Sequence, residues 1–227
     1  MKKMFCFIPA KQNSTRLENK NQVLLDGFPL FYYPISAALK SEVFKKEEVV
    51  ISSDADQILE RASVYGAFTP YKREEKLSKD PAGVYDVLLD FLNRLPAYKE
   101  YQYVCILLPT SPLTSSQDIK QAVKLVEDNQ FDCLLSVSET PHNAQLALTI
   151  NDKLLSPLHP DKIFHKSQEL EPTYHANGAI HIVNIDKMIK KESYLIEPMG
   201  SYIMPFERSI DVDTKQDLEL VKFILSR

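Results

Sequence analysis

Hydrophobic and polar positions follow two periods along the chain, one typical of buried strands and one typical of amphipathic helices. Short apolar runs predict strands at residues 4–8, 49–52, 103–108, 132–137 and 174–183. Apolar residues that recur every three or four positions predict helices at residues 30–41, 54–65, 84–95, 117–129 and 214–226. Ser53 or Asp54 is the expected N-cap of the second helix. This alternation predicts an α/β fold with a mostly parallel sheet flanked by helices.

The regular alternation stops between residues 140 and 174. This segment holds Pro141, Pro157, Pro160 and Pro172 and a strand-like AQLALTI, but no helical pattern. Because the predicted strands on both sides fit one sheet, we interpret the segment as a projecting arm of a single domain that spans residues 1–227. Such a short segment cannot bury its own apolar side chains, so we expect a second copy of the chain to cover them in a homodimer.

Composition narrows the choice of partners. Of the 227 residues, 44% are hydrophobic and 26% are charged, which is typical of a globular protein. The formal net charge of -4 predicts no broad basic surface for nucleic acid or an anionic membrane. No apolar run approaches the ~20 residues of a membrane-spanning helix, so we expect a cytoplasmic protein. Cys6, Cys105 and Cys133 fall in predicted strands without CxxC spacing and are expected to be buried thiols.

The loop after the first strand, PAKQNSTRLENKN at residues 9–21, carries the first candidate chemistry. It offers Lys11, Arg16 and Lys20 as cations, with hydroxyls and amides between them and only Glu18 opposing them. Open α/β sheets bind ligands at the carboxyl ends of their strands, where this loop begins. The motifs GxxxxGK[ST], GxGxxG and GxSxG are absent from the sequence. The loop therefore predicts a triphosphate site, with a solvated polar loop as the alternative.

Two carboxylates near the C-terminus are candidate metal ligands. Asp211 and Asp213 stand two residues apart, so in an extended segment both point to the same side and can meet one hard cation such as Mg²⁺. The alternative is that Asp213 or Thr214 caps the last helix. All five histidines lie within residues 142–181, at intervals that do not match a zinc site.

Five sequence elements, in order, resemble the acylneuraminate cytidylyltransferase family, whose members join CTP to acidic keto sugars and release pyrophosphate. They are PAKQNSTRLENKN, KREEKLSKD, LLPTSPLT, YHANGAIHI and RSIDVDTKQDL, and they span residues 9–218. The resemblance implies a Rossmann-like nucleotidyltransferase domain that uses CTP and Mg²⁺ to activate a sialic, legionaminic or pseudaminic acid.

The resemblance also implies roles for individual residues. It gives Lys11, Ser14, Lys20 and Asn21 to the triphosphate and ribose, Arg73 to the nucleotide, and Asp211 and Asp213 to the metal; we add Arg16 to the CTP site because of its charge. Lys20, Asp211 and Asp213 are the expected catalytic residues. Lys11 departs from the arginine that the family usually has and supplies a point charge without the bidentate fork.

The sugar end of the sequence combines features of several branches of the family. The expected sugar-binding residues are Lys166, Gln168, Tyr174, His175 and Asn177. KSQELEPTYH resembles the pseudaminic acid branch, whereas PTSPL and NGAI resemble the sialic and legionaminic acid branches. Leu108 stands where sialic acid members commonly have glutamine, which favours a sugar with a less polar edge. The identity of the nonulosonic acid stays open at this stage.

Three alternative functions also remain open. A Kdo-type cytidylyltransferase would accept an eight-carbon acid instead. A metal-dependent glycosyltransferase using Asp211-Val-Asp213 as a DxD motif would release a nucleoside diphosphate, not pyrophosphate. A degenerate module that binds CTP without turnover is suggested by Lys11, and detection of turnover would exclude it.

Overall fold

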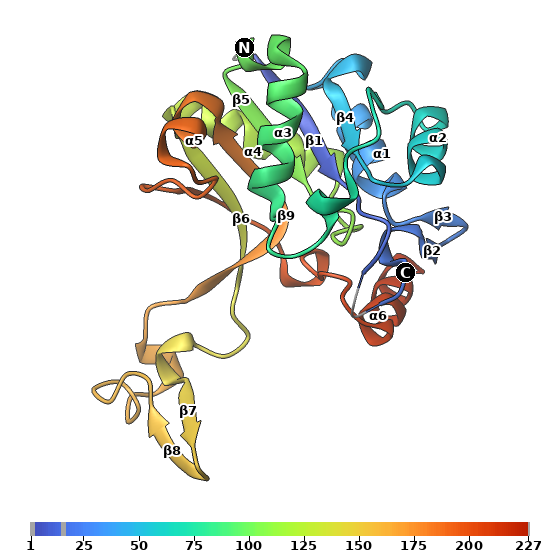
Figure 1. Ribbon diagram of the computed structural model, residues 1–227. Coiled ribbons are helices and arrows are strands. Elements are labelled where there is room, and N and C mark those ends of the chain that lie inside the picture. Colours follow the sequence, from blue (N-terminus) through green and yellow to red (C-terminus); the bar gives the residue numbers. More distant parts are fainter. Residues whose placement is uncertain (1–2, 15–16, 227) are drawn as a thin grey trace.

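A computed structural model describes residues 3–14 and 17–226, and its central feature is a six-stranded sheet with helices on both faces (Figure 1). In spatial order the strands are β10 (Gly200–Ile203), β6 (Cys133–Glu139), β9 (Tyr174–Asn184), β5 (Tyr103–Leu107), β1 (Met4–Pro9) and β4 (Val49–Ser52). Strand β9 runs antiparallel to both of its neighbours, whereas the other pairs are parallel. The prediction of a mostly parallel sheet is confirmed.

The two-residue period of the strands divides the apolar side chains between two cores. On β1, Met4, Cys6 and Ile8 belong to one core, and Phe5 and Phe7 belong to the other. The first core is covered by α1 (Tyr32–Lys40), α2 (Asp56–Val64) and α4 (Ser116–Asn129), and the second by α3 (Val84–Arg94) and α5 (Ile185–Lys191). The three cysteines are free and buried, as the sequence predicted.

A third, smaller cluster of apolar residues lies beneath the carboxyl end of the sheet. It joins the hairpin of β2 (Leu24–Leu25) and β3 (Phe28–Pro29) to α6 (Lys215–Leu225), through residues that include Leu25, Val212 and Leu218. Thr214 caps α6, since its hydroxyl accepts from the Asp217 N–H and the Asp217 carboxylate accepts from the Thr214 N–H. This packing brings the C-terminal acidic segment beside the opening loop.

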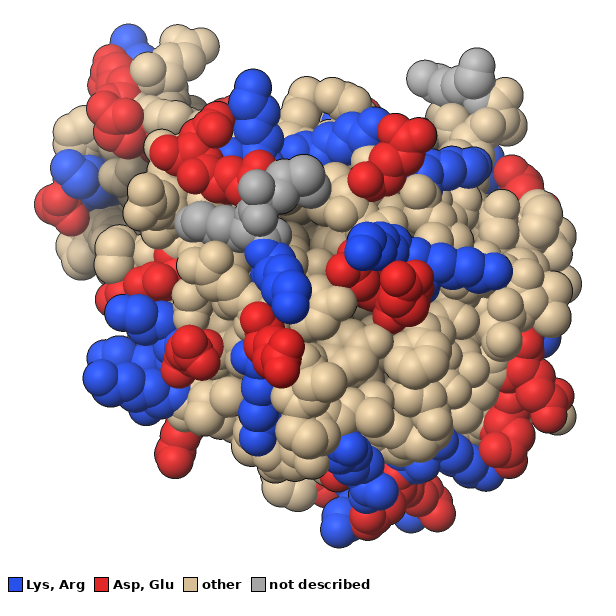
Figure 2. Space-filling model, turned by 90° about the horizontal axis from the view of Figure 1, so that it is seen from above, with Lys and Arg blue, Asp and Glu red and all other residues tan. Residues whose placement is uncertain are grey.

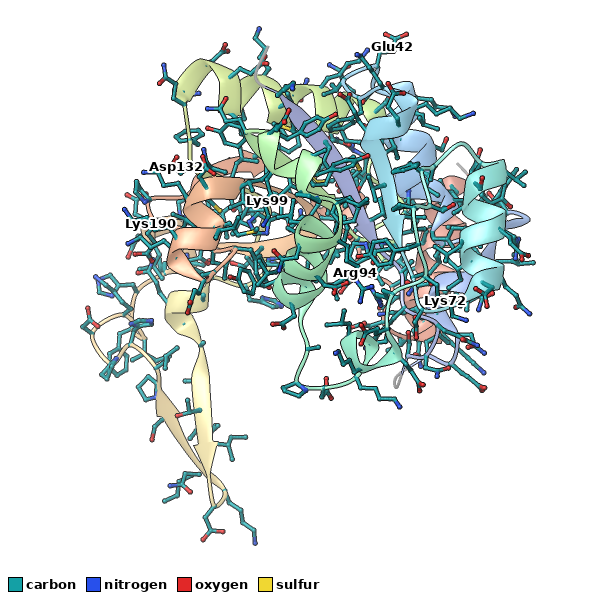
Figure 3. The ribbon with its side chains drawn as sticks, turned by 45° about the horizontal axis from the view of Figure 1, so that its top comes forward. Glu42, Lys72, Arg94, Lys99, Asp132 and Lys190 are labelled. Carbon is teal, nitrogen blue, oxygen red and sulfur yellow. The ribbon has the colours of Figure 1, made fainter. Side chains whose placement is uncertain are left out.

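The arm leaves the sheet between β6 and β9 and ends in a hairpin of β7 (Leu148–Asn151) and β8 (Leu154–Pro157). Figures 1 and 3 show the hairpin standing away from the body, with its side chains extending to either side. Ile150 and Leu154 are each 74% exposed, and Phe164 is 94% exposed. The predicted arm is therefore present, and its role in a dimer stays a prediction.

Some local predictions from the sequence are wrong or incomplete. Neither Ser53 nor Asp54 is the N-cap of α2, because the helix begins at Asp56 and Ala55 occupies that position. The Asp54 carboxylate instead accepts from the Gln12 N–H of the opening loop at 2.9 Å. The sequence analysis also did not predict α5 or β10, which lie between the NGAI strand and the acidic segment.

The surface agrees with the modest net charge. Lys and Arg side chains alternate with Asp and Glu over the face seen in Figure 2, so no extended basic surface lies there. Within residues 3–14 and 17–226, no helix has the length and apolar character needed to cross a bilayer.

Candidate active site

A cavity of about 380 Å³, which we call the main cavity, lies at the carboxyl ends of the parallel strands. The opening loop follows β1, the segment at Leu108–Thr110 follows β5, and Arg73 lies beside the end of β4, where its N–H donates to the Ser53 carbonyl. The cavity walls hold seven of the residues predicted to bind CTP or metal, namely Lys11, Ser14, Lys20, Asn21, Arg73, Asp211 and Asp213. Arg16, also predicted to bind CTP, lies outside the described residues.

The opening loop is held by hydrogen bonds of its own side chains and backbone. The Asn21 side chain is buried, and its amide donates to the Lys11 carbonyl at 2.7 Å. Asn19 adopts a left-handed conformation at φ 50, which starts the short 3-10 turn Lys20–Gln22. Asn21 therefore braces the loop, while Lys11, Ser14 and Lys20 line the cavity.

The two aspartates meet the loop through Lys20. The Lys20 Nζ atom lies 2.6 Å from Asp213 Oδ1, and both side chains are largely buried. Thr110 holds the segment at residues 211–213 on its other side. Its carbonyl accepts from the Val212 N–H at 2.7 Å, and its hydroxyl donates to the Asp211 carboxylate. Burial raises the pKa of Asp211, and the Thr110 hydrogen bond only partly opposes the shift.

Arg208, three residues before Asp211, anchors the same segment to α4. Its guanidinium pairs with the Asp118 carboxylate, which also accepts from the Tyr202 hydroxyl at 2.8 Å. Burial alone would raise the pKa of Asp118, but hydrogen bonds from Arg208, Ser115 and Tyr202 outweigh it and lower the pKa. Because Asp118 is 1% exposed, this anchor is part of the folded framework of the site.

Arg73 is buried at the opposite wall, where its guanidinium donates to Ser78 Oγ at 2.9 and 3.1 Å and to the Ser52 carbonyl. Its Nη2 atom also lies 3.9 Å from Asp54 Oδ1. Burial lowers the pKa of Arg73, and the Asp54 charge opposes that shift. Asp54 therefore links the opening loop, through Gln12, to the wall that carries Arg73.

The donor chemistry of the acidic pair fits a hard divalent cation. Asp211 and Asp213 offer only oxygen ligands, and Mg²⁺ commonly binds through one or two carboxylates, with waters and substrate phosphates completing its shell. Within the part of the chain that the structure describes, no group of three or more His, Cys, Asp or Glu side chains is arranged to hold a metal.

The structure does not bring the predicted sugar-binding residues into the main cavity. Lys166 and Gln168 are exposed in the arm, beside or within the 3-10 turn Ser167–Glu169. Tyr174 and His175 are exposed at the arm end of β9, where His175 Nε2 lies 3.2 Å from Ser138 Oγ. Asn177 is buried, and its Oδ1 accepts from Ser136 Oγ at 2.6 Å. None of these five residues lines the main cavity in the described chain.

Sequence reasoning missed two groups that shape the site. Thr110 belongs to the LLPTSPLT element, but the sequence does not indicate which residue of that element contacts Asp211. Asp54 follows a predicted strand, a position typical of ligand-facing residues, but its nearness to a helix favoured a capping role.

Comparisons with known proteins identify the family of the chain. The sequence profile of a family described as "Cytidylyltransferase" matches residues 5–196. The chain is 34% identical over 225 residues to a pseudaminic acid cytidylyltransferase of Campylobacter jejuni, covering 98% of this chain and 96% of the relative. It is 31% identical over 228 residues to a CMP-N,N'-diacetyllegionaminic acid synthase of Legionella pneumophila, covering 98% and 96%.

An N-acylneuraminate cytidylyltransferase of Streptococcus agalactiae is 34% identical over 217 residues, which is 95% of this chain but 51% of the relative. The chain thus spans about half the length of that relative. Among solved structures, a CMP:2-keto-3-deoxy-manno-octonic acid synthetase complexed with CTP has a TM-score of 0.71 at 15% identity, with 99% of this chain and 98% of that chain covered. A 4-diphosphocytidyl-2C-methyl-D-erythritol synthase from Anaerococcus prevotii has a TM-score of 0.68 at 12% identity, with 100% and 99% covered. At these identities the structural likeness concerns the fold.

Proposed function

The chain belongs to the cytidylyltransferase family, and on that basis we propose that it transfers a cytidine monophosphate group from CTP to an acidic nine-carbon sugar. The observation that carries the proposal is the cavity at the strand ends, which is lined by Lys11 and Lys20 together with Asp211 and Asp213. The relatives named for acylneuraminic, pseudaminic and legionaminic acids favour a nonulosonic acid over an eight-carbon acid.

In the proposed reaction the anomeric oxygen of the sugar attacks the α-phosphorus of CTP. The new bond joins that oxygen to phosphorus, the bond to the bridging oxygen breaks, pyrophosphate leaves, and the hydroxyl proton passes to solvent. Lys11 and Lys20 neutralise the triphosphate, and Ser14 donates a hydrogen bond to it. Such phosphoryl chemistry depends mainly on in-line positioning and charge neutralisation, so the loop is suited to it without a covalent intermediate.

Asp211 and Asp213 are the residues that would hold Mg²⁺. A bound divalent cation supplies charge neutralisation at the phosphates and polarises the attacking hydroxyl. Lys20 pairs with Asp213 and so lies next to the acidic pair, where it could also contact a triphosphate bound by that cation.

We also propose that the protein is a homodimer formed through the arm. The exposed apolar side chains of β7 and β8 need a partner surface. Lys166 and Gln168 also lie in the arm, so the same contact could bring them to the active site of the partner. If these two residues bind the sugar, they do so in the active site of the other subunit. Sedimentation of a stable monomer at micromolar concentration would contradict the dimer.

The test of the function is a screen for pyrophosphate release with CTP, Mg²⁺ and four acids: N-acetylneuraminic, legionaminic, pseudaminic and Kdo. We expect release with at least one nine-carbon acid and little with Kdo. A glycosyltransferase would release no pyrophosphate in this screen, because its nucleoside diphosphate comes from a nucleotide-sugar donor and not from CTP. CTP binding without turnover of any acid would favour a non-catalytic module.

A further inference from the structure

The main cavity has two kinds of lining. The opening loop and the acidic segment supply the charged lining described above, whereas the segment at residues 73–87 supplies Arg73 and Ser78 beside aliphatic neighbours such as Leu77 and Val84. The lining residues that this fully described segment contributes are uncharged apart from Arg73. Phosphates need the cations of the opening loop, so the more apolar lining of residues 73–87 suits the base of a bound nucleotide.

Ser78 is bonded to Arg73 in a way that occupies its oxygen and leaves its hydrogen available. Arg73 Nε donates to Ser78 Oγ at 3.1 Å, and Arg73 Nη2 donates to the same atom at 2.9 Å. A hydroxyl has two acceptor lone pairs and one O–H donor, so these two bonds use the whole acceptor capacity of Ser78. Within residues 3–14 and 17–226, no group accepts a hydrogen bond from the Ser78 hydroxyl.

The guanidinium therefore makes Ser78 a fixed donor. A serine hydroxyl without such partners can rotate to donate or to accept, but Ser78 can accept from a ligand only if a bond from Arg73 is lost. Arg73 is held in place, because its side chain is buried and its Nη1 atom also donates to the Ser52 carbonyl. Arg73 has no acceptor of its own, so the Arg73–Ser78 pair offers a ligand hydrogen-bond donors alone.

We propose that the Ser78 hydroxyl donates to the ring nitrogen N3 of the cytosine base and thereby distinguishes CTP from UTP. The inference rests on the proposed function, in which CTP is the nucleotide. Cytosine and uracil differ at N3 and at the group on C4. The C4 amino group of cytosine is itself a donor, so N3 is the differing position of cytosine that can accept from Ser78.

Uracil carries a hydrogen at N3 and would meet Ser78 donor against donor. Ser78 is half-buried before any ligand binds, and a base that covers it removes the water that could otherwise take its hydrogen. A buried donor without an acceptor costs more free energy than an ordinary hydrogen bond contributes, so UTP would be penalised by more than the loss of one bond.

Equilibrium binding of CTP and of UTP tests the inference without any sugar. Isothermal titration calorimetry in a buffer with Mg²⁺ gives the Kd for each nucleotide. We expect the wild-type protein to prefer CTP by about tenfold to a hundredfold, and Ser78→Ala to reduce that preference about tenfold. Ser78→Thr, which keeps the hydroxyl, should restore it, and the control Ser63→Ala, at an exposed position on α2, should keep it. An equal loss of CTP and UTP affinity in Ser78→Ala would overturn the inference, because it would show that Ser78 only positions Arg73 or contacts a part that both nucleotides share.

An analogue of CTP locates the contact. In 3-deazacytidine triphosphate a C–H group replaces N3, so the acceptor is removed while the amino group and the carbonyl stay. The wild-type protein should bind this analogue about tenfold more weakly than CTP, whereas Ser78→Ala should bind the two within about twofold of each other. The same weakening in both proteins would overturn the assignment of N3. Failure of the wild-type protein to bind CTP would overturn the proposed function and the inference with it, whereas pyrophosphate release with an unchanged nucleotide preference in Ser78→Ala would overturn the inference alone.

Discussion

At the carboxyl end of the sheet, Arg73 and Asp118 are buried and hydrogen-bonded within the protein, whereas in the arm apolar side chains are exposed. Arg73 is 4% exposed and Asp118 is 1% exposed, each with several hydrogen-bond partners. Ile150 and Leu154, by contrast, are 74% exposed. One chain therefore fixes the positions of the side chains around the proposed CTP site, whereas burial of the apolar side chains of the arm would require a further surface.

The largest expected effect is at the acidic pair. Asp211→Ala and Asp213→Ala should each lower kcat by about a thousandfold, because the loss of one carboxylate removes several kcal/mol of charge stabilisation in the transition state. Steady-state pyrophosphate release measures the effect, and thermal unfolding checks the fold. Asp128→Ala, at an exposed position on α4, is the control and should keep wild-type rates. Near-wild-type turnover in both active-site variants would remove the metal assignment.

The second prediction tests whether the arm acts on the sugar, whereas the body of the chain binds CTP. Lys166→Ala should lower kcat/KM for the sugar by about tenfold to a thousandfold with little change in the KM for CTP, because a substrate carboxylate would lose its cation. Steady-state kinetics, with one substrate varied while the other is saturating, measure the two effects separately. A loss confined to CTP would contradict the role of Lys166 at the sugar.

Mixing subunits sharpens this test. Lys166→Ala and Asp213→Ala should each be poorly active alone, but a 1:1 mixture that is unfolded and refolded together should recover roughly a quarter of wild-type activity, since half of the dimers are mixed and each has one intact site. No recovery, with mixed dimers demonstrated by differential tagging, would mean that Lys166 does not act across the subunit boundary.

A smaller effect is expected at the opening loop. Lys20→Ala should raise the KM for CTP by about tenfold to a hundredfold through the loss of a charge-assisted contact with the triphosphate. It also removes the ion pair with Asp213. Lys40→Ala, at an exposed position on α1, is the matched control. Unaltered CTP kinetics in Lys20→Ala would count against the loop as the triphosphate site.

The smallest effect concerns stability and the buried histidine. The pKa of His181 is lowered to about 4 in the folded protein, below its usual value, so the unfolded chain binds more protons between those two values. The contribution of His181 to the free energy of unfolding is fully present at a pH above the pKa that histidine has in the unfolded chain. It is lost as the pH falls towards 4. Between pH 7 and pH 5 the free energy of unfolding should fall by about 2 kcal/mol from this group.

Urea unfolding at the two pH values measures that loss, and His181→Gln is the comparison variant. The variant should lack this part of the acid sensitivity while keeping the contributions of other groups. The same pH dependence in both proteins would show that His181 does not titrate as its burial implies.

Much of the fold followed from periodicity, because β4, the start of α3 and the end of α4 coincide with the bounds predicted from buried apolar residues. The segment holding α5 and β10 was missed since its strand is four residues long, with only alternate positions buried. Lys20 and Asp213 were identified from motifs, but their 2.6 Å contact depends on a packing cluster between α6 and the β2–β3 hairpin, which joins distant segments. The role of Asp54 depended on a contact with Gln12, 42 residues away, which no local pattern encodes.

The proposed reaction joins the α-phosphate of CTP to an acid sugar, and ³¹P NMR of one reaction mixture can follow every phosphorus atom in it. With CTP, Mg²⁺ and the acid that is most active in the pyrophosphate screen, the account predicts that the three CTP resonances are replaced by one phosphodiester signal of a CMP-sugar and by pyrophosphate in equal molar amount. The Asp213→Ala protein should leave the CTP resonances in place over the same time. Appearance of CDP and inorganic phosphate, or of free CMP with pyrophosphate and no phosphodiester, would contradict the account.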